Sequence, residues 1–366
     1  MTPPLPVWPQ FAPGAAKAVA AILKSGRTNY WGGEYGVRFE EEFSRWAHGR
    51  QAVAVSSGTA ALHLALEALG LGKGDDVVCT PYSFRASATA AANAGARAVF
   101  ADVGDDHMLT AETIEKALTP KTKAVVVVHL YGQVADMGPI LALARRRGFK
   151  VVEDCAQALG AEYRGRKVGT LGDAGCFSFC QLKHITAGGE GGMVVCKSKK
   201  AADAVRSLRD HGWEVGTSPK RYSRIGYNFR LTEIQSALAL GELKRLDSWN
   251  LPRRRRLAER LLAALSGHPA IAQLPVDTPE RRASFWLVPV VLDTRRLGVD
   301  APSFAQALQA EGAGAYAILW PPMARRKNAL RLMRSTVGFW VHPTYGTREI
   351  DRAVRAFDKV ARVFMK

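Results

Sequence analysis

The chain has 366 residues, of which 47% are hydrophobic and 23% charged, and its formal net charge at pH 7 is +18. These proportions are typical of a globular protein with room for two domains, and they argue against a disordered chain. No run approaches the roughly 18 apolar residues of a membrane-spanning helix, and residues 1–6 lack the basic and apolar regions of a signal peptide. We therefore expect a cytoplasmic protein with no membrane insertion.

The first two thirds of the chain alternate between helical and strand patterns. We predict helices over residues 15–25, 58–69, 87–94, from about 111, over 139–147 and from about 201, and strands over 52–56, 76–80, 98–102, 124–129, 150–154, 175–179 and 193–197. The β-branched runs among these strands are typical of parallel strands buried on both faces. The repetition indicates a parallel-rich α/β sheet covered by helices on both sides.

The pattern changes near residue 246, where a basic helix is followed by a strand over 286–292 and helices over 302–309 and 348–364. We predict a large domain over residues 1–245, including an N-terminal arm, and a smaller α/β domain over 246–366. Four arginines at 253–256 begin the basic helix, and such a run is usually a solvated face. No nucleic-acid-binding motif accompanies it, so we expect no nucleic acid partner.

The chain contains five cysteines, at positions 79, 155, 176, 180 and 196, and most of them have apolar neighbours. An odd number of cysteines in such surroundings is typical of buried free thiols in a reducing compartment. No pair has the spacing of metal ligands, so we predict no metal site.

The most informative segment lies at residues 177–192. Lys183 follows a Phe-Ser-Phe strand end and precedes a turn dense in glycine, and Asp154 ends an apolar strand upstream. Most lysines are solvated surface charges, but an acid at the end of an apolar strand is costly to bury unless it is paired, which favours a functional role. An amine that forms an imine and a carboxylate that holds a pyridinium proton are the groups that a pyridoxal phosphate enzyme needs.

Further motifs follow other predicted strands, at the edge where open α/β sheets bind ligands. Residues 56–60, Ser-Ser-Gly-Thr-Ala, open a helix whose N–H groups suit a phosphate, although small residues there equally fit a plain helix cap. Phe84 can stack on a flat ring, but a residue of this kind more often belongs to the core. Gln157 lies one helical turn beyond the acid, and Ser178 precedes the lysine closely enough for a second phosphate contact.

Together these motifs resemble those of the DegT/DnrJ/EryC1/StrS family of pyridoxal-phosphate-dependent sugar aminotransferases, from about Trp8 to the C-terminus. The resemblance rests on segments 29–34, 56–62, 80–84, 95–102, 129–133, 153–158, 183–192 and 226–235. It implies pyridoxal 5'-phosphate as the cofactor and the type I fold of pyridoxal-phosphate-dependent transferases, which is aspartate aminotransferase-like, with a large, mostly parallel sheet domain and a smaller C-terminal α/β domain.

The resemblance also assigns the site. It implies that Lys183 carries the cofactor as an imine and that Asp154 pairs with its pyridinium nitrogen. The other cofactor-binding positions would be Gly58, Thr59 and Ser178 at the phosphate, Phe84 at the ring face, Gln157 at the phenolic oxygen and Asn228 from the neighbouring subunit. This implies a homodimer with shared active sites. His184 adjoins the lysine without replacing it, which favours transamination over the sugar dehydration of relatives with histidine at the lysine position.

The implied reaction moves an amino group from glutamate or glutamine to a keto-sugar, mostly nucleotide-linked in this family, for cell-surface polysaccharides or antibiotics. Two alternatives stay open. One is a 3-amino-5-hydroxybenzoate synthase-like lyase reaction or keto-cyclitol amination on the same cofactor, and the other is a regulatory protein that keeps the fold without catalysis. Substrate specificity is expected in the loops at 29–34, 213–224 and 317–326.

Overall fold

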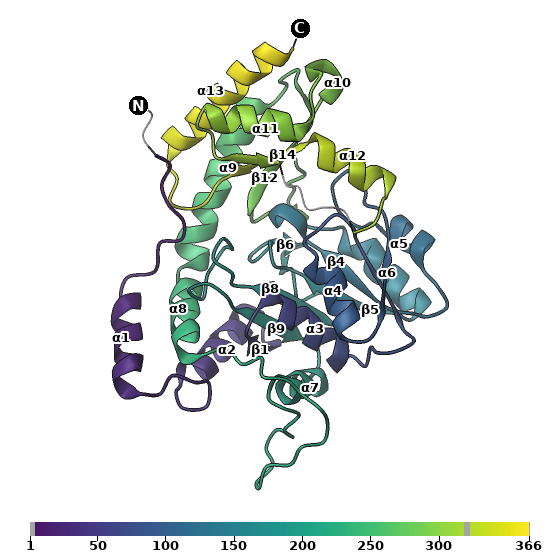
Figure 1. The fold of residues 1–366 in the computed structure, drawn as a ribbon, viewed down its shortest axis with the longest axis vertical. Helices are drawn as coiled ribbons and strands as arrows, with labels where there is room; N and C mark the ends of the chain where they lie inside the picture. Colours follow the sequence, from purple (N-terminus) through teal and green to yellow (C-terminus); the bar gives the residue numbers. More distant parts are fainter. Residues whose placement is uncertain (1–3, 318–322, 366) are drawn as a thin grey trace.

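The computed structural model describes residues 4–317 and 323–365. A seven-stranded sheet lies at its centre, with the strand order β1-β9-β8-β5-β4-β2-β3 (Figure 1). Its strands are β1 (Gln51–Val55), β2 (Asp76–Cys79), β3 (Arg97–Phe100), β4 (Thr122–Val128), β5 (Lys150–Asp154), β8 (Ala174–Ser178) and β9 (Gly192–Cys196). Strand β9 runs antiparallel to both neighbours, and all other pairs are parallel. The predicted mostly parallel sheet is confirmed.

Helices cover both faces of this sheet, as predicted. One face carries α3 (Gly58–Ala68), α4 (Ala86–Asn93) and α7 (Lys199–Arg209), and the other carries α2 (Tyr35–Trp46), α5 (Ala111–Ala117), α6 (Met137–Arg147) and α8 (Glu233–Lys244), against which α1 (Ala15–Ser25) packs. Successive residues of β4 alternate between the two cores: Val125 and Val127 face one, Ala124 and Val126 the other.

The sequence analysis did not predict two of these helices, α2 and α8. Thr232 caps α8: its hydroxyl accepts from the backbone N–H of Gln235, whose side chain accepts from the N–H of Thr232 in return. This Thr-x-x-Gln capping box is a local signal that marks the start of a helix in the sequence.

A second, antiparallel sheet follows in the chain, with the order β10-β12-β14-β13. Its elements are β10 (Ile271–Gln273), β12 (Leu287–Leu292), β13 (Ala315–Ala317) and β14 (Thr336–Trp340), with α9 (Leu251–Leu265), α10 (Thr294–Leu297), α11 (Ala301–Ala310) and α13 (Thr347–Phe364) around it. A small third sheet joins β6 (Glu162–Tyr163) to β7 (Arg166–Lys167) and β11 (Arg281–Arg282).

We propose that the two domains divide between residues 245 and 246, because every strand of the second sheet follows that point. The π-helical turn η2 (Leu246–Asn250) joins α8 to α9 there. Helix α12 (Lys327–Ser335) returns to the large domain, since its residues Ala329, Leu332 and Met333 pack in the core of the first sheet.

The prediction of a solvated arginine run at 253–256 is wrong. Arg254 is fully buried, Arg253 and Arg255 are half-buried, and Arg256 alone of the four is exposed. Helix α9 leads from η2 to the small domain, where it packs against α13 (Figure 1), and Arg254 lies on the buried face of this helix. The guanidinium groups donate to backbone carbonyl oxygens of Pro343, Phe285, Ala283 and Gly160 instead of water.

All five cysteines are free, four of them buried and Cys180 half-buried, which confirms the predicted free thiols. Within residues 4–317 and 323–365, no helix combines the length and apolar character needed to cross a membrane.

Candidate active site

The carboxyl ends of β4, β5 and β8 meet at one edge of the large sheet, beside a cavity of about 340 Å³. Each strand places its last residue, Val128, Asp154 or Ser178, in the cavity wall. Seven of the eight predicted site residues line this cavity: Gly58, Thr59, Phe84, Asp154, Gln157, Ser178 and Lys183. The eighth, Asn228, does not line it. Parallel strands explain the gathering, since their carboxyl ends share one edge.

Asp154 is held in a fixed position at the end of β5. Its side chain is buried, and it accepts hydrogen bonds from the Ser87 hydroxyl at 2.8 Å and from the Ala156 backbone N–H at 3.1 Å. Burial raises the pKa of Asp154, and these two hydrogen bonds together with the charge of Lys183 oppose that rise. The geometry therefore keeps a carboxylate in an apolar wall, where it can hold a proton on a bound partner.

Lys183 lies in an irregular turn after β8, and its half-buried side chain faces the same cavity. Burial lowers the pKa of its amine, and the carboxylate of Asp154 acts in the opposite direction. The Lys183 Nζ lies 4.5 Å from the ring centroid of Trp286. A lowered pKa leaves more of the amine neutral at a given pH, and the neutral amine is the nucleophile in imine formation.

The N-terminus of α3 forms a further wall. Ser57 caps the helix, because its hydroxyl accepts from the Ala60 N–H at 3.1 Å. A Cβ on Gly58 would lie 2.7 Å from the Ser178 Cβ, so glycine is required for the helix to approach β8 this closely. The unpaired N–H groups of the first turn and the helix dipole, with the hydroxyl groups of Thr59 and Ser178, make a cradle suited to a phosphate.

Gln157 and Phe84 complete the predicted set. The Gln157 Oε1 accepts from the Tyr131 backbone N–H at 2.8 Å, which leaves the amide nitrogen as the donor available to the cavity. Phe84 lines the cavity and its side chain is 56% exposed, so it does not belong to the core.

A buried polar cluster of His129, Glu153 and Cys155 lies beside the site, with its potential ligand atoms within 4.8 Å of one another. The Ala135 N–H donates to His129 Nδ1 at 3.2 Å, so Nε2 carries the proton and donates to Glu153 at 3.1 Å. Glu153 also accepts from the backbone N–H groups of residues 169, 171 and 172. The carboxylate is therefore already engaged, which indicates a structural network that supports β5.

Sequence reasoning missed Trp286, which precedes β12 and forms part of the cavity wall. Its indole N–H donates to the Leu182 carbonyl oxygen at 2.7 Å, and its side chain is buried. The sequence gives only a weak signal for this residue, namely that a buried tryptophan in an apolar strand needs a hydrogen-bond partner for its N–H. Nothing local identifies that partner, which lies 104 positions away.

The family model of the DegT/DnrJ/EryC1/StrS aminotransferases matches residues 10–336. This chain belongs to that family. The predictions of an aminotransferase that depends on pyridoxal phosphate and has fold type I are confirmed.

Individual relatives match most of the length of this chain. The L-glutamine:2-deoxy-scyllo-inosose aminotransferase of Streptomyces paromomycinus is 38% identical over 343 residues, or 89% of this chain and 80% of that protein. The pleiotropic regulatory protein of Geobacillus stearothermophilus is 37% identical over 272 residues, or 73% of this chain and 72% of that protein. A crystal structure of DesV from S. venezuelae, in complex with a ketimine intermediate, has a TM-score of 0.86 and 34% identity and covers 95% of this chain and 94% of its own.

The structure also bears on two further predictions, Asn228 and the specificity loop at 317–326. Asn228 is exposed on the segment that follows α7, where the chain extends as a long loop away from the sheets (Figure 1). Residues 318–322 of the predicted specificity loop at 317–326 lie outside the described residues.

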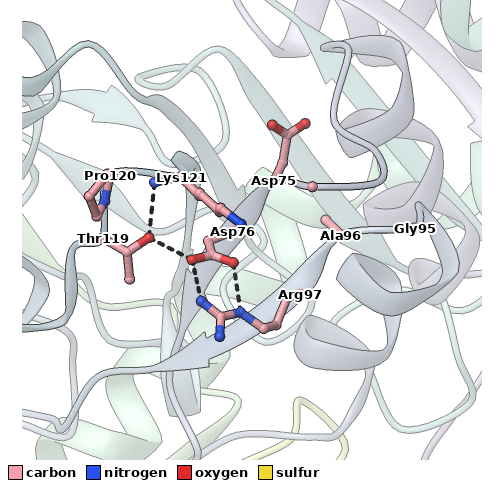
Figure 2. Close-up of a pocket in the computed structure, with 9 residues that line it drawn as sticks. Asp75, Asp76, Gly95, Ala96, Arg97, Thr119, Pro120 and Lys121 are labelled. Carbon is pink, nitrogen blue, oxygen red and sulfur yellow. Dashed lines mark hydrogen bonds and ion pairs between the residues drawn. The ribbon is translucent and has the colours of Figure 1, made fainter.

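A larger cavity of about 540 Å³ lies at the opposite edge of the large sheet, between the amino ends of β2, β3 and β4 (Figure 2). The Arg97 guanidinium donates to Asp76 at 2.8 and 2.6 Å, and the Thr119 hydroxyl donates at 2.5 Å. The hydrogen bonds from Arg97 lower the pKa of Asp76 to about 2. Asp76 is therefore a paired carboxylate that stays ionised.

Proposed function

We propose that this aminotransferase moves an amino group from glutamate or glutamine to a nucleotide-linked keto-sugar. The proposal is carried by one observation: the amine of Lys183, the carboxylate of Asp154 and the N-terminus of α3 border the same cavity. The name of the relative from Streptomyces paromomycinus supports glutamine as a donor.

The cavity wall fits pyridoxal phosphate. The first-turn N–H groups at Gly58 and Thr59, with the Ser178 hydroxyl, would hold the phosphate. Phe84 would cover the ring, and the amide nitrogen of Gln157 would donate to the phenolic oxygen. Bound there, the cofactor supplies a conjugated ring that withdraws electrons from the substrate Cα.

Two side chains of this protein, Asp154 and Lys183, would then hold and transfer the protons. Asp154 holds a proton on the ring nitrogen, because its carboxylate is fixed by Ser87 and the backbone at residue 156. Lys183 takes the proton from the Cα of the amino donor and returns one to the carbon of the keto-sugar in the second half-reaction. Leu182 and Trp286 supply apolar surface that limits the access of water to the amine.

Keto-cyclitol amination is a second candidate, and the composition of the cavity wall favours it. Among the described residues that line the cavity, Lys183 is the only lysine or arginine. A nucleotide diphosphate usually binds cationic side chains, whereas an uncharged cyclitol needs none.

The two candidates are separated by a substrate panel. The purified enzyme would be incubated with glutamate or glutamine and, in turn, with nucleotide-linked 3-keto-sugars and 4-keto-sugars and with an inosose. Mass spectrometry of the aminated product identifies the acceptor. Product from a nucleotide-linked sugar supports the first proposal, product from the inosose alone supports the second, and no amination of any acceptor contradicts both.

We also propose a homodimer with shared active sites, located in the cytoplasm, where a reducing environment suits five free thiols. The dimer is supported by Asn228, which is exposed and lies outside its own chain's cavity, and by exposed apolar side chains on the preceding loop, namely Val215, Tyr222 and Ile225.

Mixing two inactive variants tests the shared site. Asn228→Ala should weaken phosphate binding from the partner's side, and Lys183→Ala should remove the lysine. If each site combines both chains, a mixed dimer keeps one site with both native residues, and random mixing restores about a quarter of wild-type activity. Activity is measured after the two variants are unfolded and refolded together. No recovery, or a monomer in analytical ultracentrifugation, contradicts the proposal.

A further inference from the structure

The turn that carries Lys183, residues 180–187, forms no helix or regular strand. On its sheet side the backbone is held by hydrogen bonds from the Gln181 N–H to the Gly189 oxygen at 2.9 Å and from the Ala187 N–H to the Phe179 oxygen at 3.0 Å. The carbonyl groups on its other side need different partners, because a buried carbonyl without a hydrogen bond is costly. We call residues 180–187 the lysine turn.

Side-chain N–H groups donate hydrogen bonds to three consecutive carbonyl oxygens of the lysine turn. Trp286 Nε1 donates to the Leu182 oxygen at 2.7 Å, Trp8 Nε1 to the Lys183 oxygen at 3.1 Å and Asn250 Nδ2 to the His184 oxygen at 2.5 Å. The donors come from three separate parts of the chain: the small domain, the N-terminal arm and the turn η2 between α8 and α9. The backbone on both sides of the catalytic lysine is thus tied to distant segments.

Arg254 connects these three donors to one another. Its Nε donates to Asn250 Oδ1 at 2.7 Å, its Nη1 donates to the Phe285 carbonyl oxygen at 3.3 Å, and its guanidinium carbon lies 5.4 Å from the ring centroid of Trp8. The side chain is fully buried, and burial lowers its pKa to about 9. Burying a guanidinium is expensive, and the hydrogen bonds from Nε and Nη1 offset part of that cost.

Trp8 is well fixed, although it belongs to an extended arm. Its ring stacks against Trp249 and His342, with centroids 6.4 and 6.1 Å away, and it is 5% exposed. Farther along the arm, the Ala12 N–H donates to the Glu242 carboxylate of α8 at 2.7 Å. Trp8 is not among the residues that line the cavity, so it can act on the lysine only through the turn.

We propose that Trp8, Asn250 and Trp286 form a clamp that fixes the lysine turn, and that Trp8 is a positioning residue for Lys183. The lysine amine sits at the end of a flexible chain of methylene groups, so its reach toward a reacting carbon depends on where the backbone is held. Displacements of about 1 Å in such groups cost large factors in rate. The catalytic part of this inference rests on the proposed function of Lys183, whereas the structural part does not.

The test compares two matched tryptophan variants of the full-length protein. Trp8→Phe keeps an aromatic ring in the stack but removes the N–H donor to Lys183. Trp249→Phe makes the same change in the neighbouring ring, for which no hydrogen bond to the turn is found among the described residues. Hydrogen exchange by mass spectrometry, with pyridoxal phosphate present, measures the opening of residues 181–187, and residues 150–154 of β5 serve as the internal reference.

We expect Trp8→Phe to speed exchange in the lysine turn by about 3- to 10-fold, the effect of losing one hydrogen bond, with β5 unchanged. The borohydride-trapped adduct at Lys183 should form more slowly by a similar factor, and Trp249→Phe should match the wild type in both measurements. Equal exchange in Trp8→Phe and the wild type overturns the clamp, and so does an equal increase in the two variants.

A second variant covers the case in which Trp8→Phe fails to fold. Asn250→Asp keeps an acceptor for Arg254 but removes the donor to the His184 oxygen, and it should loosen the same turn. Unchanged exchange in a folded Asn250→Asp protein contradicts the clamp. If the wild-type protein itself forms no adduct at Lys183, the proposed function fails, while the exchange comparison still decides whether the clamp exists.

Discussion

Lys183→Ala is expected to lower amino transfer by about 10⁴-fold or more and to remove the visible absorbance of the lysine-linked cofactor. The variant loses both the nucleophile that binds the cofactor covalently and the base that moves the Cα proton, and a positioned base alone contributes about 10²–10⁴-fold. Single-turnover rates with glutamate, together with absorbance spectra of the purified protein, measure both effects.

Lys167 provides the matched control. It is a second half-buried lysine that faces a tryptophan, with its Nζ 3.9 Å from the Trp46 ring centroid, and burial also lowers its pKa. It does not line the cavity, so Lys167→Ala should keep the absorbance and the rate. A fully active Lys183→Ala protein, or a borohydride adduct on another side chain, would refute the assignment of the catalytic lysine.

Asp154→Asn is expected to retain the cofactor but to lose about 10²–10⁴-fold in rate. The substitution preserves the shape of the side chain and removes the charge that would hold the proton on the ring nitrogen. Removing one member of a buried charged pair costs about 3–5 kcal/mol of free energy. Each 1.36 kcal/mol added to the activation free energy lowers the rate about tenfold. Steady-state rates and cofactor content of the purified variant measure the two effects.

The same variant should change the pH dependence of adduct formation at Lys183. The Asp154 carboxylate raises the pKa of Lys183 against the effect of burial, so its removal lowers that pKa further. The neutral amine then persists to lower pH, and the acidic limb of the trapping rate should move to lower pH. A shift to higher pH would show that a different group sets the charge of the lysine.

Asp76→Asn serves as the control for Asp154→Asn. Asp76 is also a buried carboxylate at an end of a strand in the same sheet, but it lies at the opposite edge and is paired with Arg97 (Figure 2). This variant should keep the wild-type rate in its folded state. Wild-type turnover in Asp154→Asn would mean that another acid acts on the ring nitrogen.

Local sequence patterns were sufficient for the framework of the large domain. The helix at Ala15–Ser25 and the strand at Lys150–Asp154 match their predictions residue for residue, because a glycine ends the first and β-branched residues with a closing acid define the second. The same reasoning identified seven residues that line one cavity, since motifs at the carboxyl ends of parallel strands share an edge of the sheet.

Tertiary packing alone determined which charged side chains are buried and which distant residues donate hydrogen bonds to the lysine turn. The arginine run at 253–256 has the local pattern of a solvated face, yet Arg254 is buried because the face of α9 that carries it packs against the rest of the protein. The indoles of Trp8 and Trp286 reach the lysine turn across 175 and 104 positions of the chain. Neighbouring residues determine a backbone conformation and a helix cap, but a hydrogen bond between distant segments depends on how whole domains pack, and no local pattern encodes that.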